Sequence, residues 1–341
     1  FRDIVGGILG EPELDGGAVG QDAARRGEVR EAVVVAVLAD ANPVVKEEIA
    51  RILGELKDTS AVQPLADAID YAVGGGSDRQ TQDANSANKE IARALGDLGD
   101  RAAVKPLLKL LRTTKDNYVR VEALGSLGRI KDPQAVTLIS DVATDERLET
   151  FINKKAIQAL TEINSPEALP TYMRMLFVER RGVSFYPESA FGIFLLGDAA
   201  KDAVLAVLKD EDKSLLDWAK ERSIIKPALY AKAAQLESDL QDPRAVAPLL
   251  KLLKYEDEDE NAKGFVRTTA ADTLGRMQAK EALGPISAML SEEEAGLRAA
   301  YVRALVQLGD KAAVRKLLDC SGRGNWFARD ACMLGVAMLG G

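Results

Sequence analysis

One alternation of apolar and polar positions recurs eight times along the chain. In each copy an apolar segment ends in leucine, usually followed by glycine, and a short polar turn leads to Ala-Val and a second apolar segment. Two clear copies read LGELKDTSAVQPLADAI from Leu53 and LGDLGDRAAVKPLLKLL from Leu95. Within each segment the apolar residues lie three and four positions apart, so each copy predicts a pair of helices joined by a turn.

The spacing of the copies predicts the architecture. Successive Ala-Val positions, or their equivalents, lie 31 to 42 residues apart, which is the period of two-helix repeats that stack into a solenoid. We therefore expect an all-α solenoid (a superhelix) of about eight helical hairpins. We expect an N-terminal extension and capping helix over 1–41 and a solenoid over 42–341, with repeats near 42–72, 87–112, 116–143, 149–178, 187–209, 225–254, 264–290 and 294–319 and a final half repeat over 324–339.

The turn inside each hairpin carries two position-specific predictions. Three residues before the alanine of the Ala-Val pair stands a side chain that can accept hydrogen bonds from the free amides of the second helix, and we expect it to cap that helix. These residues are Asp58, Asp100, Asp132, Ser165, Asp242 and Asp310. Five residues before the alanine stands an apolar residue that should close the hairpin core: Leu56, Leu98, Ile130, Ile163, Leu240, Met277 and Leu308. The fifth repeat breaks this pattern with Asp198.

These strings resemble a known repeat family. The opening Asp116-x-x-Val119-Arg120, the ALGDLGD turn from Ala94 and the AVKPLL second helix from Ala103 are similar to HEAT repeats of the phycobilisome-lyase-like subtype. The resemblance runs roughly from Asn42 to Gly340 and departs at 74–88, 179–188, 210–228 and 255–264. It implies HEAT-type hairpins with first helices on a convex face and second helices lining a concave one. We expect Asp116 and Arg120 to bridge neighbouring repeats.

Composition narrows the chemistry. The chain has 341 residues, a net charge of -8 and no histidine. Without histidine, Ser-His-Asp catalysis and HExxH zinc sites are excluded in their usual form, and we expect no enzyme activity and no cofactor. The acidic balance disfavours nucleic acid, which needs clustered positive charge. No apolar run reaches membrane-spanning length. We expect a bacterial protein of the cytoplasm or periplasm, and the start at Phe1, without Met, is compatible with a removed signal peptide or lipoprotein leader.

The two cysteines, Cys320 and Cys332, form no CxxC motif and cannot complete a four-cysteine zinc site. We expect them as a pair of buried thiols, since free cysteine behaves as a small apolar residue; a disulfide between them is the alternative. The residues that follow, Gly324–Leu339, predict a final first-type helix that lacks its partner and exposes an apolar face.

Ten residues are candidate contacts for a protein partner. Second helices carry basic residues that could form a stripe on the concave side: Lys105, Lys109, Arg112, Lys251, Lys254 and Arg315. The insertion at 179–188 mixes basic and aromatic side chains of the kind that dominate interface energetics: Arg180, Arg181, Phe185 and Tyr186. Ordinary solvated charges and local packing are the competing explanations for these two sets.

The sequence thus favours a non-catalytic scaffold or adaptor that binds a partner through its concave face and edge loops, as a subunit of a larger assembly. Two alternatives stay open. One is a small-molecule-handling protein like the bilin lyases that share this repeat type, which would need a pocket with specific carboxylates or aromatic side chains. The other is DNA recognition by a HEAT-like surface, which the acidic balance opposes.

Overall fold

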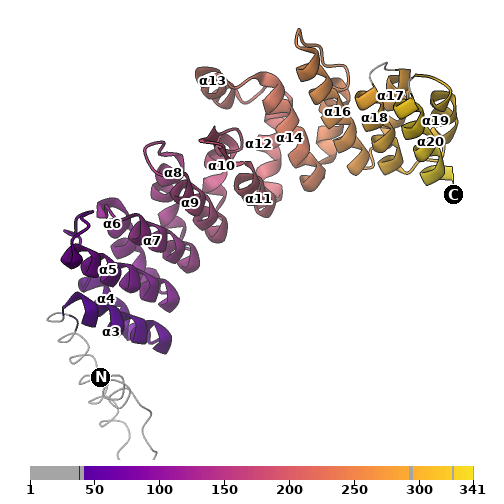
Figure 1. The fold of residues 1–341 in the computed structure, drawn as a ribbon. Coiled ribbons are helices and arrows are strands. Elements are labelled where there is room, and N and C mark those ends of the chain that lie inside the picture. The colour runs from indigo at the N-terminus through magenta and orange to yellow at the C-terminus, as the bar shows by residue number, and fades with distance from the viewer. Residues whose placement is uncertain (1–37, 39–41, 292–294, 325, 341) are drawn as a thin grey trace, which may run out of the picture. The chain divides into compact units, whose positions relative to one another are not determined.

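The computed structural model describes residues 38, 42–291, 295–324 and 326–340, and shows an all-α solenoid of stacked helical hairpins (Figure 1). The chain divides into two compact units, Phe1–Thr171 and Tyr172–Gly341. In each unit the first helices of successive hairpins pack side by side: α3 on α5, α5 on α7 and α7 on α9 in one unit, and α14 on α16, α16 on α18 and α18 on α20 in the other.

The first helices of the hairpins are α3 (Pro43–Leu56), α5 (Arg79–Leu98), α7 (Asn117–Ile130), α9 (Thr150–Ile163), α11 (Tyr186–Leu196), α14 (Lys226–Leu240), α16 (Glu260–Arg276), α18 (Ala295–Leu308) and α20 (Trp326–Gly340). The second helices are α4 (Val62–Asp67), α6 (Val104–Thr113), α8 (Val136–Thr144), α10 (Leu169–Met175), α12 (Asp198–Leu208), α15 (Val246–Leu252), α17 (Leu283–Ala288) and α19 (Ala313–Ser321). Two insertions add the helix α13 (Lys213–Glu221) and a hairpin of β1 (Glu179–Arg180) and β2 (Val183–Ser184).

The predicted caps are confirmed at all six positions. Asp58, Asp100, Asp132, Ser165, Asp242 and Asp310 each accept a hydrogen bond from the amide two residues later, at 2.8–3.4 Å. In five hairpins the capped segment is a single 3-10 turn, such as Pro133–Ala135, which leads into the second helix. The cap therefore sets where the hairpin turns, and it does so with residues adjacent in the sequence.

The hairpin core lies under the leucine of the repeat motif. Leu95 and Leu127 are completely buried, as an apolar residue facing both helices of its hairpin should be. The predicted core closers are less uniform: Ile130, Ile163, Leu240 and Leu308 are buried. Leu56 is 48% exposed, so its assignment to the core was wrong. The second helix of that repeat, α4, spans only Val62–Asp67 and is too short to cover Leu56.

Two of the sequence departures contain more helix than expected. Helix α5 begins at Arg79, within the segment 74–88 that breaks the repeat pattern, because Asp78 caps it by accepting from the Thr81 amide at 2.9 Å. The buried Asn88 side chain then binds Asp70, donating to its carbonyl at 2.7 Å and accepting from its amide at 3.0 Å. In the other departure Asp259 caps α16, whose first residue is Glu260.

The Asp-Arg pair at the start of α7 works differently from the expected bridge. Asp116 caps α7 by accepting from the Tyr118 and Val119 amides at 2.8 and 2.9 Å. Arg120 donates to the carbonyl of Thr114 at 2.7 Å, and Thr114 ends the preceding second helix. The aspartate therefore acts within its own helix, and only the arginine reaches back to the previous repeat.

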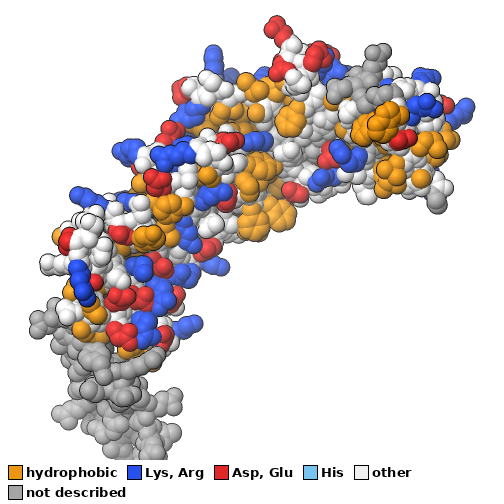
Figure 2. Space-filling view, in the orientation of Figure 1, with side chains coloured by type: hydrophobic (Ala, Val, Ile, Leu, Met, Phe, Trp, Pro, Cys, Tyr) orange, Lys and Arg blue, Asp and Glu red, His pale blue; other side chains and the backbone are white. Residues whose placement is uncertain are grey.

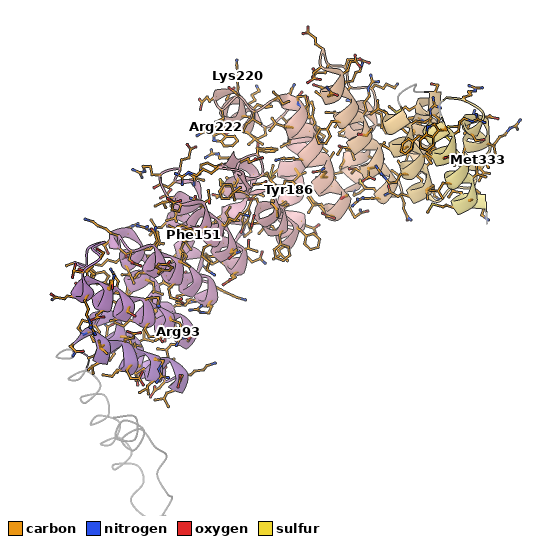
Figure 3. All side chains as sticks on the ribbon, in the orientation of Figure 1. Arg93, Phe151, Tyr186, Lys220, Arg222 and Met333 are labelled. Atoms are coloured by element: carbon orange, nitrogen blue, oxygen red, sulfur yellow. A yellow bond between two sulfur atoms is a disulfide. The ribbon has the colours of Figure 1, made fainter. Side chains whose placement is uncertain are left out.

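The C-terminal hairpin is closed covalently. Cys320 of α19 and Cys332 of α20 form a disulfide with 5.9 Å between their Cα atoms, so the expected pair of thiols was wrong. The two residues face each other because both lie on the buried sides of packed helices. Away from the bridge, α20 exposes Trp326, Met333, Leu334 and Met338 (Figure 3).

Two further statements complete the fold. Within 42–291, 295–324 and 326–340, no helix is long and apolar enough to cross a membrane. The predicted capping helix over 22–40 lies outside the described residues, apart from the buried Leu38.

Candidate functional site

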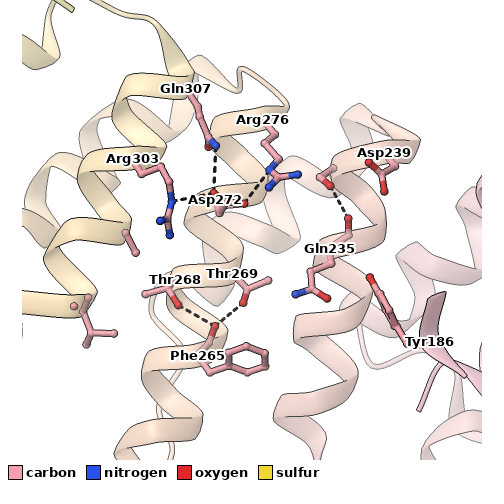
Figure 4. Close-up of a pocket in the computed structure, with 14 residues that line it drawn as sticks. Tyr186, Gln235, Asp239, Phe265, Thr268, Thr269, Asp272, Arg276, Arg303 and Gln307 are labelled. Carbon is pink, nitrogen blue, oxygen red and sulfur yellow. Dashed lines mark hydrogen bonds and ion pairs between the residues drawn. The ribbon is translucent and has the colours of Figure 1, made fainter. Parts of the chain in front are cut away.

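A groove with a volume of about 810 Å³ lies on the layer of first helices in the C-terminal unit (Figure 4). Helix α16 forms its floor, α14 and α18 form its walls, and Tyr186 from the start of α11 closes one side. The lining residues are Tyr186, Gln235, Ser238, Asp239, Phe265, Thr268, Thr269, Asp272, Arg276, Gly296, Leu297, Ala300, Arg303 and Gln307. The walls are neighbours of the floor in the solenoid, so repeat stacking itself creates the groove.

The floor is one face of α16. Phe265, Thr268, Thr269 and Asp272 follow each other at spacings that place them on one stripe of a helix, while Val266 and its neighbours on the opposite face are buried. The two threonine hydroxyls donate to backbone carbonyls of their own helix, at 2.8 and 2.7 Å. They leave the central floor without a free hydroxyl donor, and the chemistry of the groove is concentrated at its two ends.

Phe265 marks the apolar end, with half of its surface exposed. It stands nine residues before the buried Leu274, the same place in the repeat as the exposed Val44, Tyr118 and Phe151. On the next first helix, α18, this place is taken by Gly296. A residue without a side chain cannot cover the neighbouring ring, so the phenyl group stays accessible from the groove.

The charged end is organised by Asp272. Its carboxylate pairs with Arg276 Nε of the same helix at 2.9 Å and with Arg303 Nε of α18 at 3.6 Å. It also accepts a hydrogen bond from the Gln307 side-chain amide at 3.3 Å. One carboxylate thus holds two guanidinium groups from adjacent repeats, both more than half exposed.

Tyr186 contributes an aromatic wall beside a partly buried lysine. Burial raises the pKa of the Tyr186 hydroxyl, and the negative charge of Asp239 raises it further. Lys232 Nζ lies 5.2 Å from the centre of the Tyr186 ring and donates to the Leu176 carbonyl at 2.7 Å. Burial lowers the pKa of Lys232, and these contacts fix the position of the tyrosine ring.

The four candidate residues of the insertion have different environments. Arg180 is half-buried in β1, and Arg181 is exposed at the turn of the hairpin. Phe185 is only 1% exposed, so it belongs to the core and is corrected as a contact residue. Tyr186 reaches the groove from the first position of α11 (Figure 3). Packing of the insertion onto its own repeat therefore accounts for the phenylalanine and leaves the tyrosine accessible.

The six basic candidates of the second helices are all exposed: Lys105, Lys109, Arg112, Lys251, Lys254 and Arg315. The first three lie on one face of α6 in the N-terminal unit, and the other three belong to the C-terminal unit. Lys109 Nζ stands 3.8 Å from the centre of the Tyr71 ring, a cation–π contact. They therefore form two separate sets, one in each unit.

Sequence reasoning missed the residues that build the groove: Phe265, Asp272, Arg276 and Arg303. The first three could have been found by aligning the repeats, since Phe265, Tyr118 and Phe151 share one position and the charged pair follows on the same helical face. Arg303 offers no such signal, because its approach to Asp272 depends on how α16 and α18 pack.

Comparison with known proteins supports the repeat assignment. A family model for HEAT repeats matches residues 80–153 and 262–335, and a model for the PBS lyase HEAT-like repeat matches residues 45–71. A comparison with curated proteins gives no match. Among solved structures, the karyopherin Kap121p bound to the SUMO protease Ulp1p has a TM-score of 0.61 at 12% identity, over 99% of this chain and 41% of that one. This likeness shows the fold alone, and the chain spans less than half of Kap121p.

Two smaller proteins align along nearly their whole length but superpose less well. Human deoxyhypusine hydroxylase in complex with glycerol has 16% identity and a TM-score of 0.36, over 94% of this chain and 99% of that one. The complex of CpcE and CpcF of phycocyanin lyase from Nostoc sp. PCC7120 has 19% identity and a TM-score of 0.35, over 97% and 99% of the two chains. Likeness at this level carries no conclusion about activity.

Proposed function

Because this chain is a HEAT-repeat protein, we propose that it acts as a non-catalytic scaffold that holds a protein partner as one subunit of an assembly. Solenoids present long surfaces built from equivalent positions of successive repeats, which suits extended contacts. The fold alone does not dictate this role, so the proposal depends on a surface with the properties of a binding site.

The groove of the C-terminal unit is the observation that carries the proposal. It combines an accessible aromatic ring, Phe265, with two arginines, and aromatic residues and arginine are the side chains enriched at interface hot spots. Its central carboxylate, Asp272, is already engaged by Arg276, Arg303 and Gln307. A carboxylate held by three donors is suited to positioning neighbouring groups rather than to accepting protons from a substrate.

Two other surfaces fit the same role. Helix α11 exposes Phe191, Phe194 and Leu195, which form an apolar patch visible in Figure 2, and such patches mark interaction sites. In the N-terminal unit Lys105, Lys109 and Arg112 offer a basic face on α6 for an acidic partner segment. Contacts of that kind mainly raise the association rate and weaken with salt.

Site-specific photo-crosslinking tests the proposal. A benzophenone amino acid replaces Thr268 on the floor of the groove, and a matched variant carries it at Lys316 on the exposed side of α19. After irradiation in native lysate, we expect one dominant adduct with the first variant that saturates with added lysate and is absent with the second. Equal labelling at both positions, or no adduct at Thr268, would show that the groove does not hold a protein.

A further inference from the structure

The two arginines of the groove are held in a way that leaves their donors available. Asp272 contacts each guanidinium only through Nε, at 2.9 Å for Arg276 and 3.6 Å for Arg303. Among the described residues, no other ion pair or hydrogen bond engages either side chain. The terminal Nη atoms are the part of guanidinium that forms paired hydrogen bonds with an oxyanion, so Asp272 orients two such groups toward one end of the groove.

The apolar end of the groove is a defined distance away. Phe265 and Arg276 lie eleven residues apart on α16, which corresponds to about 16 Å along the axis at a helical rise of about 1.5 Å per residue. An extended peptide covers that length with about five residues. Gly296 and Leu297 of α18 flank the Phe265 end, so an apolar side chain placed there would meet apolar surface.

We propose that the groove binds an extended segment of a partner protein in which an aromatic or large aliphatic residue precedes an aspartate or glutamate by about five positions. The apolar side chain packs on Phe265, and the carboxylate is bound by the Nη atoms of Arg276 and Arg303. This proposal rests on the scaffold function above and names the chemistry of the partner.

The groove favours one acidic side chain over a polyanion. Its four charged side chains, Asp239, Asp272, Arg276 and Arg303, sum to zero, and the whole chain carries a net charge of -8. A ligand with many negative charges would meet this field unfavourably, whereas a single carboxylate gains two paired contacts. Asp239, on the α14 wall, opposes an acidic ligand and therefore provides a test with the opposite sign.

The experiment selects its own ligand. A random twelve-residue peptide library on phage is panned against the wild-type protein, with the double variant Arg276→Gln, Arg303→Gln used to remove peptides that bind elsewhere. We expect enrichment of peptides with an aromatic or large aliphatic residue about five positions before Asp or Glu. Failure to enrich such peptides, while the Thr268 crosslink to a partner is still found, would overturn this inference and leave the scaffold function standing.

The best peptide is then measured by fluorescence anisotropy against single variants. Arg303→Gln should weaken binding about tenfold, because a charge-assisted hydrogen bond contributes about 1.5–3 kcal/mol. Arg303→Lys should recover only part of the loss, Asp239→Asn should tighten binding about twofold, and Arg315→Gln on α19 should change nothing. Circular dichroism of each variant checks that the helices are intact.

Replacing the acidic residue of the peptide provides the decisive comparison. With glutamine in its place, the peptide should lose about tenfold on the wild type and nothing further on Arg303→Gln, the signature of one shared contact. Equal binding of the acidic and glutamine peptides would contradict the proposal. So would a phosphoserine peptide that binds where the carboxylate peptide does not, because the arginine pair would then be a phosphate site.

Discussion

Ser126 donates a hydrogen bond of 2.7 Å from its buried hydroxyl to the carbonyl oxygen of Ala92, one repeat earlier. Thr273 makes the corresponding bond to Ala234, at 2.9 Å, in the other unit. Such bonds join the first helices of successive repeats at the point where the helices approach most closely. The approach requires a small residue beside the acceptor, and in the first case this is Gly96.

Gly96→Ala should therefore destabilise the N-terminal unit. A Cβ at this position would come within 2.5 Å of Ser126 Oγ and 2.6 Å of Ser126 Cβ, and overpacking of this kind costs about 1–3 kcal/mol. Gly284→Ala is the matched control, because nothing lies within 4 Å of a Cβ there. That change should be neutral or stabilise α17 by up to about 1 kcal/mol. Urea unfolding of both variants makes the measurement, and equal midpoints would refute the close contact.

Glu237→Leu should stabilise the protein at pH 8. Glu237 occupies the place of the buried leucines Leu95 and Leu127 and is itself completely buried. Its carboxyl oxygens reach no donor at hydrogen-bonding geometry. Burial raises the pKa of Glu237 to about 7, and the nearby Asp242 adds to the increase, against smaller opposing effects of the Asp242 amide, Lys201 and Arg244.

The raised pKa fixes the sign of the pH dependence. Between about pH 4.5 and 7 the folded protein binds the proton more tightly than the unfolded chain, so stability from this group falls as pH rises through that window. The difference amounts to about 3 kcal/mol. Stability curves of the wild type and Glu237→Leu should converge near pH 4.5 and separate above pH 7. Glu237→Gln should also lose the pH dependence, and parallel curves for wild type and Leu variant would contradict the assignment.

Leu127→Ala should cost about 2–5 kcal/mol, the range for a leucine removed from a packed core. Leu127 is completely buried at the end of α7. Leu56→Ala provides the comparison, since its side chain is nearly half exposed and its loss should cost less than about 1 kcal/mol. Chemical unfolding gives both values. A similar cost at the two sites would show that burial does not distinguish them.

The disulfide should anchor the last helix. Cys320 and Cys332 are twelve residues apart, and closing a loop of this size contributes about 3 kcal/mol in the chain-entropy model. We expect no thiol to titrate in protein unfolded without reductant, and reduction should lower the melting temperature. Two titratable thiols under those conditions would show that the bridge is absent.

Charge reversal on α6 tests the basic face. Lys105→Glu with Lys109→Glu should slow association with an acidic partner several-fold at low salt and much less at high salt. Lys109 also contacts Tyr71, so its reversal should cost up to about 1 kcal/mol of stability. Lys131→Glu, on the turn after α7, is the control. Unchanged association of the double variant would exclude this face and favour the groove.

The sequence by itself determined the elements that depend on neighbouring residues. Asp58, Asp100 and Asp132 could be assigned as caps because a side chain two residues before an amide reaches it without help from the fold. The leucine periodicity likewise determined which helix face is buried, as Leu127 shows. Such local features predicted the solenoid and the place of its turns.

Tertiary structure decided everything that joins one repeat to the next. Arg303 and Asp272 belong to different helices, and their contact at 3.6 Å follows from the packing of α16 and α18. Leu56 has the sequence of a core residue, yet its exposure depends on the short partner helix α4. Cys320 and Cys332 could be a bridge or two thiols until the approach of α19 and α20 placed them together. Periodicity specifies the face of each helix, whereas the distance between faces depends on the volumes of all the side chains packed between them.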